Sequence, residues 1–163
     1  MADQLKNRSM IVAVTAMLVL TAMTMTPGTA RADVCDDQVA QLTKTVDGIK
    51  FGKVRAGVIP LEHKAVSRAS LACSGRNITN ELFAAAPTNK PSPEFYDFIA
   101  SAGAVIFSIS KSDVLRGAQR CAGRIGFIRG KNIETRYRRL DVRCTGSKTE
   151  TTISISREKE ANT

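Results

Sequence analysis

The stretch RCAGRIGFIRGKNIETRYRRLDVRC, from Arg120 to Cys144, contains the residues of this chain whose types and spacing could support specific chemistry. Eight of its residues are arginine or lysine, and a cysteine stands near each end. Guanidinium groups bind phosphate, carboxylate and sulfate through forked hydrogen bonds, and two cysteines can form a disulfide or hold a metal. The stretch therefore allows three interpretations: an anion-binding surface, a metal site, or a disulfide-linked hairpin with a solvated face.

The cysteines favour disulfides over a metal site. An even number of cysteines in an exported chain is typical of a disulfide framework. The chain has no Cys-x-x-Cys pair, and His63 is its only histidine, whereas cysteine-based zinc sites use paired short spacings. The sequence predicts two disulfides, no metal and no other cofactor. The four cysteines are Cys35, Cys73, Cys121 and Cys144.

The first 32 residues have the three parts of a secretory signal peptide. Lys6 and Arg8 precede an apolar run from residue 10 to residue 23, and an Ala-x-Ala site ends at Ala32. The apolar run is too short for a membrane-spanning helix, so cleavage after Ala32 is preferred over an anchor. Residues 33–163 then form one small exported domain, periplasmic or secreted, with no membrane span after cleavage. Residues 156–163 are expected to be a frayed tail.

Hydrophobic spacing predicts two helices before the basic stretch. The first is capped by Asp36 or Asp37 and keeps apolar residues at helical spacing as far as Val46. The central helix begins at Ser92–Pro93, a favourable helix start, and its apolar face should belong to the core. Residues 104–110 fit either the end of this helix or a strand.

The region between these helices gives weaker signals. Residues 49–60 and 65–75 are rich in β-forming side chains and predict two strands, whereas residues 77–87 predict a short helix. The order of the strands within residues 49–87 stays open.

The basic stretch itself is interpreted as two antiparallel strands, residues 120–128 and 136–144, joined by a turn. With Cys121 opposite Cys144, the register places Ile125 opposite Leu140, so the apolar side chains lie on the disulfide side of the ribbon. This match favours a Cys121–Cys144 disulfide among the three connectivities that four cysteines allow. The pairing Cys35–Cys73 follows by elimination.

Two further expectations come from the same register. Arg124 would lie opposite Asp141 as a cross-strand ion pair, and residues 150–157 would add a third strand with Ile153 beside Leu140. The predicted fold is therefore α+β. An N-terminal helix and a central helix pack on a mostly antiparallel sheet that ends in a three-stranded C-terminal meander, with two disulfides.

The positive charge is concentrated in one region. The whole chain has 24 basic and 15 acidic residues. Residues 111–148 hold eleven of the basic and three of the acidic residues, whereas residues 33–110 are balanced at eight of each. In the register above, the outer face of the meander collects the candidate binding residues. They are Arg120, Arg124, Tyr137, Arg139 and Arg143.

The composition and compartment predict a non-catalytic exported envelope protein, a binding or accessory module with an anionic partner. That partner would be an acidic protein surface, a lipid headgroup or a polysaccharide. A merely solvated sheet face is the simpler interpretation. Export argues against nucleic acid. The alternative is a small periplasmic enzyme with an unrecognised site, in which Glu62 and His63 could form an acid–base pair, although the chain has none of the common hydrolase or phosphate-loop motifs. The sequence does not identify the partner or the oligomeric state.

Overall fold

The computed structural model describes residues 30–73, 80–126, 128 and 130–157, with side chains from Cys35 onward. Most of the expected signal peptide and the end of the expected tail lie outside these residues. Within them, three helices and seven strands follow one another along the chain. The helices are α1 (Ala30–Thr45), α2 (Pro93–Phe107) and α3 (Lys111–Ala122). The strands are β1 (Lys50–Phe51), β2 (Val58–Glu62), β3 (Arg68–Ala72), β4 (Glu81–Ala85), β5 (Asn132–Tyr137), β6 (Leu140–Gly146) and β7 (Thr151–Ser156).

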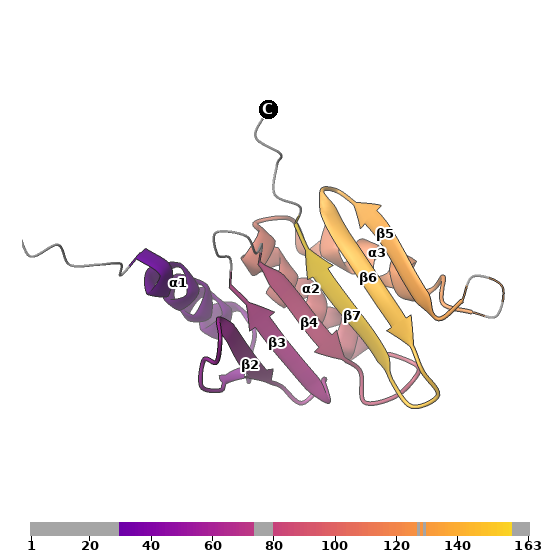
Figure 1. Ribbon diagram of the computed structural model, residues 1–163, viewed down its shortest axis with the longest axis horizontal. Coiled ribbons are helices and arrows are strands. Elements are labelled where there is room, and N and C mark those ends of the chain that lie inside the picture. Colours follow the sequence, from indigo (N-terminus) through magenta and orange to yellow (C-terminus); the bar gives the residue numbers. More distant parts are fainter. Residues whose placement is uncertain (1–29, 74–79, 127, 129, 158–163) are drawn as a thin grey trace, which may run out of the picture.

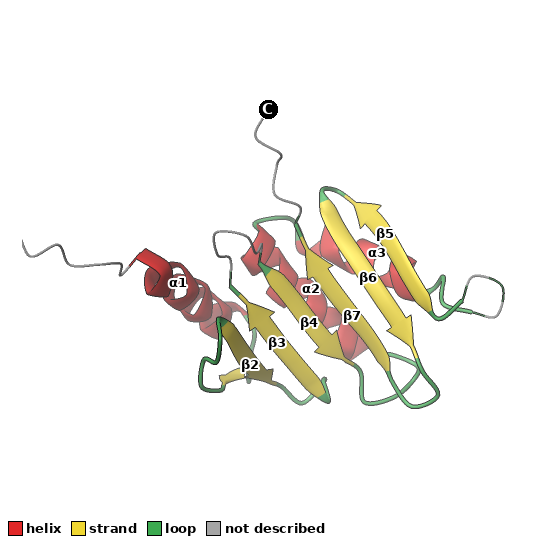
Figure 2. Ribbon diagram, viewed as in Figure 1, coloured by secondary structure: helices red, strands yellow, loops and turns green. Residues whose placement is uncertain are grey.

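The strands form one antiparallel sheet in the order β1-β2-β3-β4-β7-β6-β5. Two meanders, β1 to β4 and β5 to β7, join where β4 pairs with β7. Helices α2 and α3 cover one face of this sheet, and α1 lies beside α2 towards the β2 end (Figure 1). Figure 2 shows the resulting two layers, in which no described helix covers the opposite face of the sheet. The predicted α+β class, with helices on a sheet that ends in a three-stranded meander, is confirmed.

The core lies between the two layers because the strands alternate between buried and exposed residues. In β7, Thr151, Ile153 and Ile155 are buried, and the residues between them point to the open face. Phe95 and Phe98 of α2 pack onto this inner surface and are almost completely buried. One inward face and one wet face are typical of an antiparallel sheet with helices on one side.

Both predicted disulfides are present. Cys35 is bonded to Cys73 and Cys121 to Cys144, with Cα atoms 5.9 Å apart in each pair. Each bond ties a helix to the sheet: the first connects α1 to the end of β3, and the second connects α3 to β6. The pairings are confirmed, but the expected position of Cys121 on a strand is wrong.

The predicted strand over residues 120–128 is replaced by the end of α3 and a turn. Val114, Ala118 and Cys121 recur at helical spacing and are fully buried, and Ser110 caps the helix by accepting a hydrogen bond from the Asp113 amide. Burial of this amphipathic helical face is more favourable than the short apolar alternation within residues 120–128 that had suggested a strand.

The partner of β6 is instead β5, which changes the predicted register. Tyr137 pairs with Leu140, and Arg138 and Arg139 form a two-residue turn between them, both with positive φ. The turn expected between residues 128 and 136 is therefore wrong, because β5 occupies Asn132–Tyr137, and the Ile125–Leu140 and Arg124–Asp141 pairings are wrong as well. The third predicted strand is confirmed as β7, although Ile153 pairs with Cys144 rather than with Leu140.

Three other expectations are decided by the structure. Residues 81–85 form β4 rather than a helix, because Leu82 and Ala84 fill inward positions between β3 and β7. Residues 104–107 complete α2, which ends at Ser108 in the left-handed conformation. Helix α1 begins at Ala30, so neither Asp36 nor Asp37 caps it.

Candidate functional site

The open face of the sheet, expected to be basic, carries balanced charge. The strand registers place four basic and four acidic residues on it. The basic residues are Lys50, Arg68, Arg136 and Arg143, and the acidic ones are Glu62, Glu81, Glu134 and Asp141. The expectation that the outer face of the meander collects the excess positive charge is wrong, because the charges there compensate one another.

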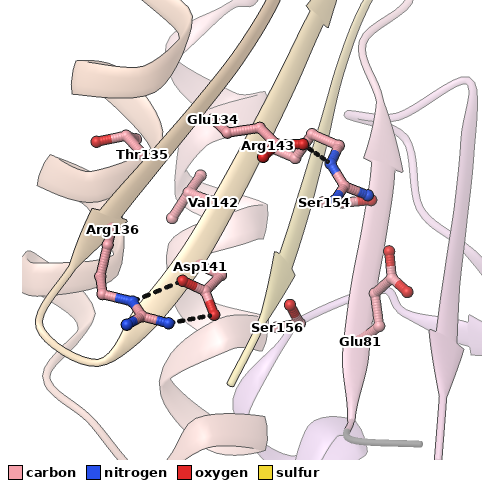
Figure 3. Close-up of a pocket in the computed structure, with 9 residues that line it drawn as sticks. All are labelled: Glu81, Glu134, Thr135, Arg136, Asp141, Val142, Arg143, Ser154 and Ser156. Atoms are coloured by element: carbon pink, nitrogen blue, oxygen red, sulfur yellow. Dashed lines mark hydrogen bonds and ion pairs between the residues drawn. The ribbon is translucent and has the colours of Figure 1, made fainter. Parts of the chain in front are cut away.

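Two ion pairs account for most of this compensation near β5 and β6. Arg136 donates from Nε to Asp141 Oδ1 at 2.8 Å and from Nη2 to Oδ2 at 3.1 Å. Arg143 donates from Nε to Glu134 Oε1 at 2.8 Å. The hydrogen bonds from Arg136 hold the pKa of Asp141 below its ordinary value. These arginines are therefore already engaged with carboxylates (Figure 3).

A shallow groove of about 470 Å³ lies between these pairs and β4 on the open face. Its lining residues are Glu81, Glu134, Thr135, Arg136, Asp141, Val142, Arg143, Ser154 and Ser156. Figure 3 shows Glu81 on the far side of the groove from the Arg136–Asp141 pair. The lining includes no histidine or cysteine, and the low pKa of Asp141 suits a permanent ion-pair partner rather than a general acid. The groove can bind a polar ligand, but its side chains do not form a nucleophile–base pair of a known kind.

The excess positive charge lies instead along α3. Arg116 and Arg120 are one turn apart on the helix, and Arg124 follows after four more residues, just beyond the helix end. All three lie on the side of α3 away from α2, because the i, i+4 spacing repeats nearly the same direction. Arg124 Nη1 lies 3.5 Å from Thr135 Oγ1, which places this side chain against β5.

The turn between β5 and β6 brings two more arginines to the same side. Arg138 Nε lies 4.0 Å from Asp113 Oδ1, and Arg116 Nη2 lies 3.4 Å from the same oxygen. Arg139 is the next residue of the turn. We call the surface formed by Arg116, Arg120, Arg124, Arg138 and Arg139 the α3–β5 flank. Asp113 is the carboxylate beside Arg116 and Arg138 on this flank.

Gly117 marks where the turn approaches the helix. A Cβ atom at this position would lie 3.4 Å from Tyr137 Cδ1, so the Tyr137 ring packs directly against the helix backbone. Tyr137 points inward and is half-buried, so it positions the turn beside α3 rather than presenting an open ring to a ligand.

Four of the five predicted binding residues are therefore brought to the same part of the molecule. Arg120, Arg124, Tyr137 and Arg139 lie at or against the α3–β5 flank, although not on the sheet face that had been expected. Arg143 is separate, on the open face with Glu134.

Arg116 and Arg138 were missed by the sequence reasoning. The four-residue spacing of Arg116, Arg120 and Arg124 could have identified the first of them. Arg138 could be assigned to this surface only from its tertiary contact with Asp113.

His63 has a structural setting. Its Nδ1 accepts a hydrogen bond from the Ala65 amide at 3.2 Å, so Nε2 carries the proton and donates to Asp47 O at 3.1 Å. The ring also stacks on Phe98, with centroids 4.8 Å apart. Both nitrogens are thus engaged, and the predicted acid–base pairing with Glu62 has no hydrogen bond to support it in the described residues.

The described residues contain no group of three or more histidine, cysteine, aspartate or glutamate side chains placed to hold a metal ion. None of the helices in the described part of the chain combines the length and apolar character needed to cross a bilayer. Comparison of the chain with protein-family models, curated proteins and solved structures gives no match in any of the three.

Proposed function

We propose that this protein is a non-catalytic exported binding module that contacts an anionic partner through the α3–β5 flank. The observation that carries the proposal is the contrast between two surfaces. The open sheet face has equal numbers of basic and acidic residues. On the flank, Asp113 contacts Arg116 and Arg138, and no acidic residue separates Arg116, Arg120 and Arg124 in the sequence. Arg120 makes no hydrogen bond or ion pair within the described residues, so its guanidinium is available to an external oxyanion.

The chemistry of the flank suits an oxyanion. Arginine presents its donors in a planar fork that matches phosphate and carboxylate, and it does not lose its charge at physiological pH. Several such groups on one side of a molecule also accelerate encounters with an anionic surface. Because the charges are exposed, salt should weaken the attraction, with a screening length of about 10 Å at 0.1 M ionic strength.

Export is part of the same proposal. Residues 1–32 have the composition of a signal peptide, and the two disulfides suggest folding in an oxidising compartment. In the periplasm or outside the cell, the available anions are acidic protein surfaces, lipid headgroups and acidic polysaccharides.

The flank is tested by neutralising two of its arginines together, Arg120→Gln and Arg124→Gln. A matched control removes the same charge from the loop between β1 and β2, with Lys53→Gln and Arg55→Gln, both exposed. The probe is fluorescently labelled polyphosphate, and the measurement is its dissociation constant at low and at high salt. Two lost contacts of about 0.7 kcal/mol each predict roughly tenfold weaker binding for the flank variant.

The control variant should bind within about twofold of the unchanged protein, since its charges lie in a different part of the molecule. If both variants lose affinity equally, net charge alone explains the binding and the flank is not a site. If the unchanged protein does not bind the probe at low salt, an anion-binding role is wrong.

A further inference from the structure

Between α3 and β5, the described residue Ile128 presents an apolar side chain to solvent. The Gly126 amide donates a hydrogen bond to Gly130 O at 3.1 Å, which closes the loop at its base. Gly130 has φ of 83°, a conformation that glycine adopts without a steric cost. Ile128 lies midway between these glycines and is 95% exposed, more than the other exposed large hydrophobic residues, Val54 and Val58.

The base of this loop is held firmly on the sheet. The Gly146 amide of β6 donates to Lys131 O at 2.8 Å. Ile125 packs so closely over Gly146 that a Cβ atom there would lie 2.6 Å from Ile125 Cγ2. The Cys121–Cys144 disulfide fixes the end of α3 to the same strand. The described residues on either side of the segment that carries Ile128 are therefore fixed to the sheet.

The charged residues closest to Ile128 in the sequence are all basic. No acidic residue occurs in the sequence between Asp113 and Glu134. Arg124 precedes Ile128 by four residues and Lys131 follows it by three, so chain geometry keeps their Cα atoms within roughly 15 Å of it. Arg120 lies one turn before Arg124 on the α3–β5 flank. An exposed aliphatic side chain is thus bordered by cations.

We propose that Ile128 and the neighbouring cations dock on an anionic lipid bilayer, with Ile128 entering the interface and Arg120, Arg124 and Lys131 meeting the headgroup phosphates. The proposal rests on the anion-binding role of the flank. A bilayer supplies both features at once, an anionic surface and an apolar layer a few ångströms below it. A polysaccharide or polyphosphate offers the charge but no apolar layer, so it leaves the exposure of Ile128 without a role.

The test uses the protein recovered after export, with its N-terminus determined by mass spectrometry so that residues 1–32 do not contribute to lipid binding. The chain contains no tryptophan, so Ile128→Trp introduces a single tryptophan, whose emission can be excited selectively above the absorption of the two tyrosines. Vesicles of phosphatidylcholine with phosphatidylglycerol should shift its emission to shorter wavelength, and vesicles of phosphatidylcholine alone should not. Val54→Trp, an exposed site between β1 and β2, should show no shift with either vesicle.

Binding is then measured by vesicle flotation. Ile128→Ser should bind the anionic vesicles roughly tenfold more weakly, because burial of an aliphatic side chain is worth at least that factor, yet bind polyphosphate unchanged. Arg120→Gln with Arg124→Gln should weaken both interactions.

The outcomes separate this proposal from the function it rests on. If Ile128→Ser binds vesicles as the unchanged protein does, or if neutral vesicles bind equally well, lipid docking is wrong. If polyphosphate is bound through the arginines but no vesicle is bound, lipid docking is wrong and the anion-binding function stands. If neither probe is bound, both proposals fail. Thermal unfolding of each variant confirms that the fold is retained.

Discussion

The contact between Gly103 of α2 and Val114 of α3 gives the sharpest test of the packing that supports the α3–β5 flank. A Cβ atom on Gly103 would lie 2.8 Å from Val114 Cγ1 and 3.4 Å from Cγ2. Val114 is fully buried, and its branched side chain has few alternative rotamers, so it cannot move aside easily. The change Gly103→Ala should therefore separate the two helices or force a strained rotamer.

Two opposing effects set the size of this change. Alanine is favoured over glycine inside a helix by about 1 kcal/mol. Overpacking a buried contact costs about 1–3 kcal/mol. Because the new methyl group would meet both branches of a buried valine, we expect the second effect to be larger. The free energy of unfolding should fall by about 1–2 kcal/mol.

Gly117→Ala is the matched control, since this glycine is also buried inside a helix. Its added methyl group would meet Tyr137 Cδ1 at 3.4 Å, an ordinary contact distance, so the variant should be neutral or gain up to about 1 kcal/mol. Urea unfolding of the oxidised proteins measures both free energies. The helix-contact argument is refuted if Gly103→Ala is as stable as Gly117→Ala.

A second variant checks the cause of the effect. Val114→Ala alone should cost about 1.6 kcal/mol for two lost methylene equivalents. Combined with Gly103→Ala, it removes the clash, so the double variant should cost clearly less than the two single changes together. Additive costs would show that the two side chains do not interact.

Two further outcomes follow from the disulfides and from the ion pairs of the open face. Replacing Cys121 and Cys144 by alanine should lower the free energy of unfolding by about 3 kcal/mol, because the disulfide restricts the unfolded chain. Opening the Cys35–Cys73 disulfide should lower it slightly more, because that bond closes a longer loop. Urea unfolding measures both changes, and a loss below about 1 kcal/mol would contradict the expectation. The pKa of Asp141 is lowered by Arg136 in the folded protein. The ionised Asp141 carboxylate therefore contributes its full stabilisation above the pKa that this residue has in the unfolded chain. That stabilisation is lost as the pH falls through the lower pKa of Asp141 in the folded protein. Arg136→Gln should flatten that acid-side slope in unfolding measured against pH, and an unchanged slope would exclude the pair as its source.

The placement of charge shows why both layers matter for the proposed function. Arginines on the strands form ion pairs with carboxylates on the adjacent strand, as Arg143 of β6 does with Glu134 of β5. On α3, the residues one turn from Arg120 are Arg116 and Arg124, so this row of cations has no carboxylate within it. Strand arginines such as Arg143 are therefore paired across the sheet, whereas Arg120 on the helix has no ion pair within the described residues, and the proposed function rests on that difference.

Several parts of the fold were predictable because the signals were local. Ser92 and Pro93 mark the start of α2, and Ser92 Oγ accepts a hydrogen bond from the amide of Phe95 in the structure. The alternation of β7 was equally clear, since threonine and isoleucine occupy every second position. The disulfide pairing was also correct, although the Cys121–Cys144 bond connects a helix to a strand rather than two strands.

The sequence by itself thus determined the elements with strong local patterns, the class of the fold and the concentration of positive charge between residues 111 and 148. Only the tertiary structure decided that residues 81–85 form a central strand and that Cys121 belongs to a helix, because short apolar runs fit either period until their neighbours are known. It also decided where the arginines point. A turn at Arg138–Arg139 can reach Asp113 only because α3 packs behind β5, and that contact joins residues far apart in the chain.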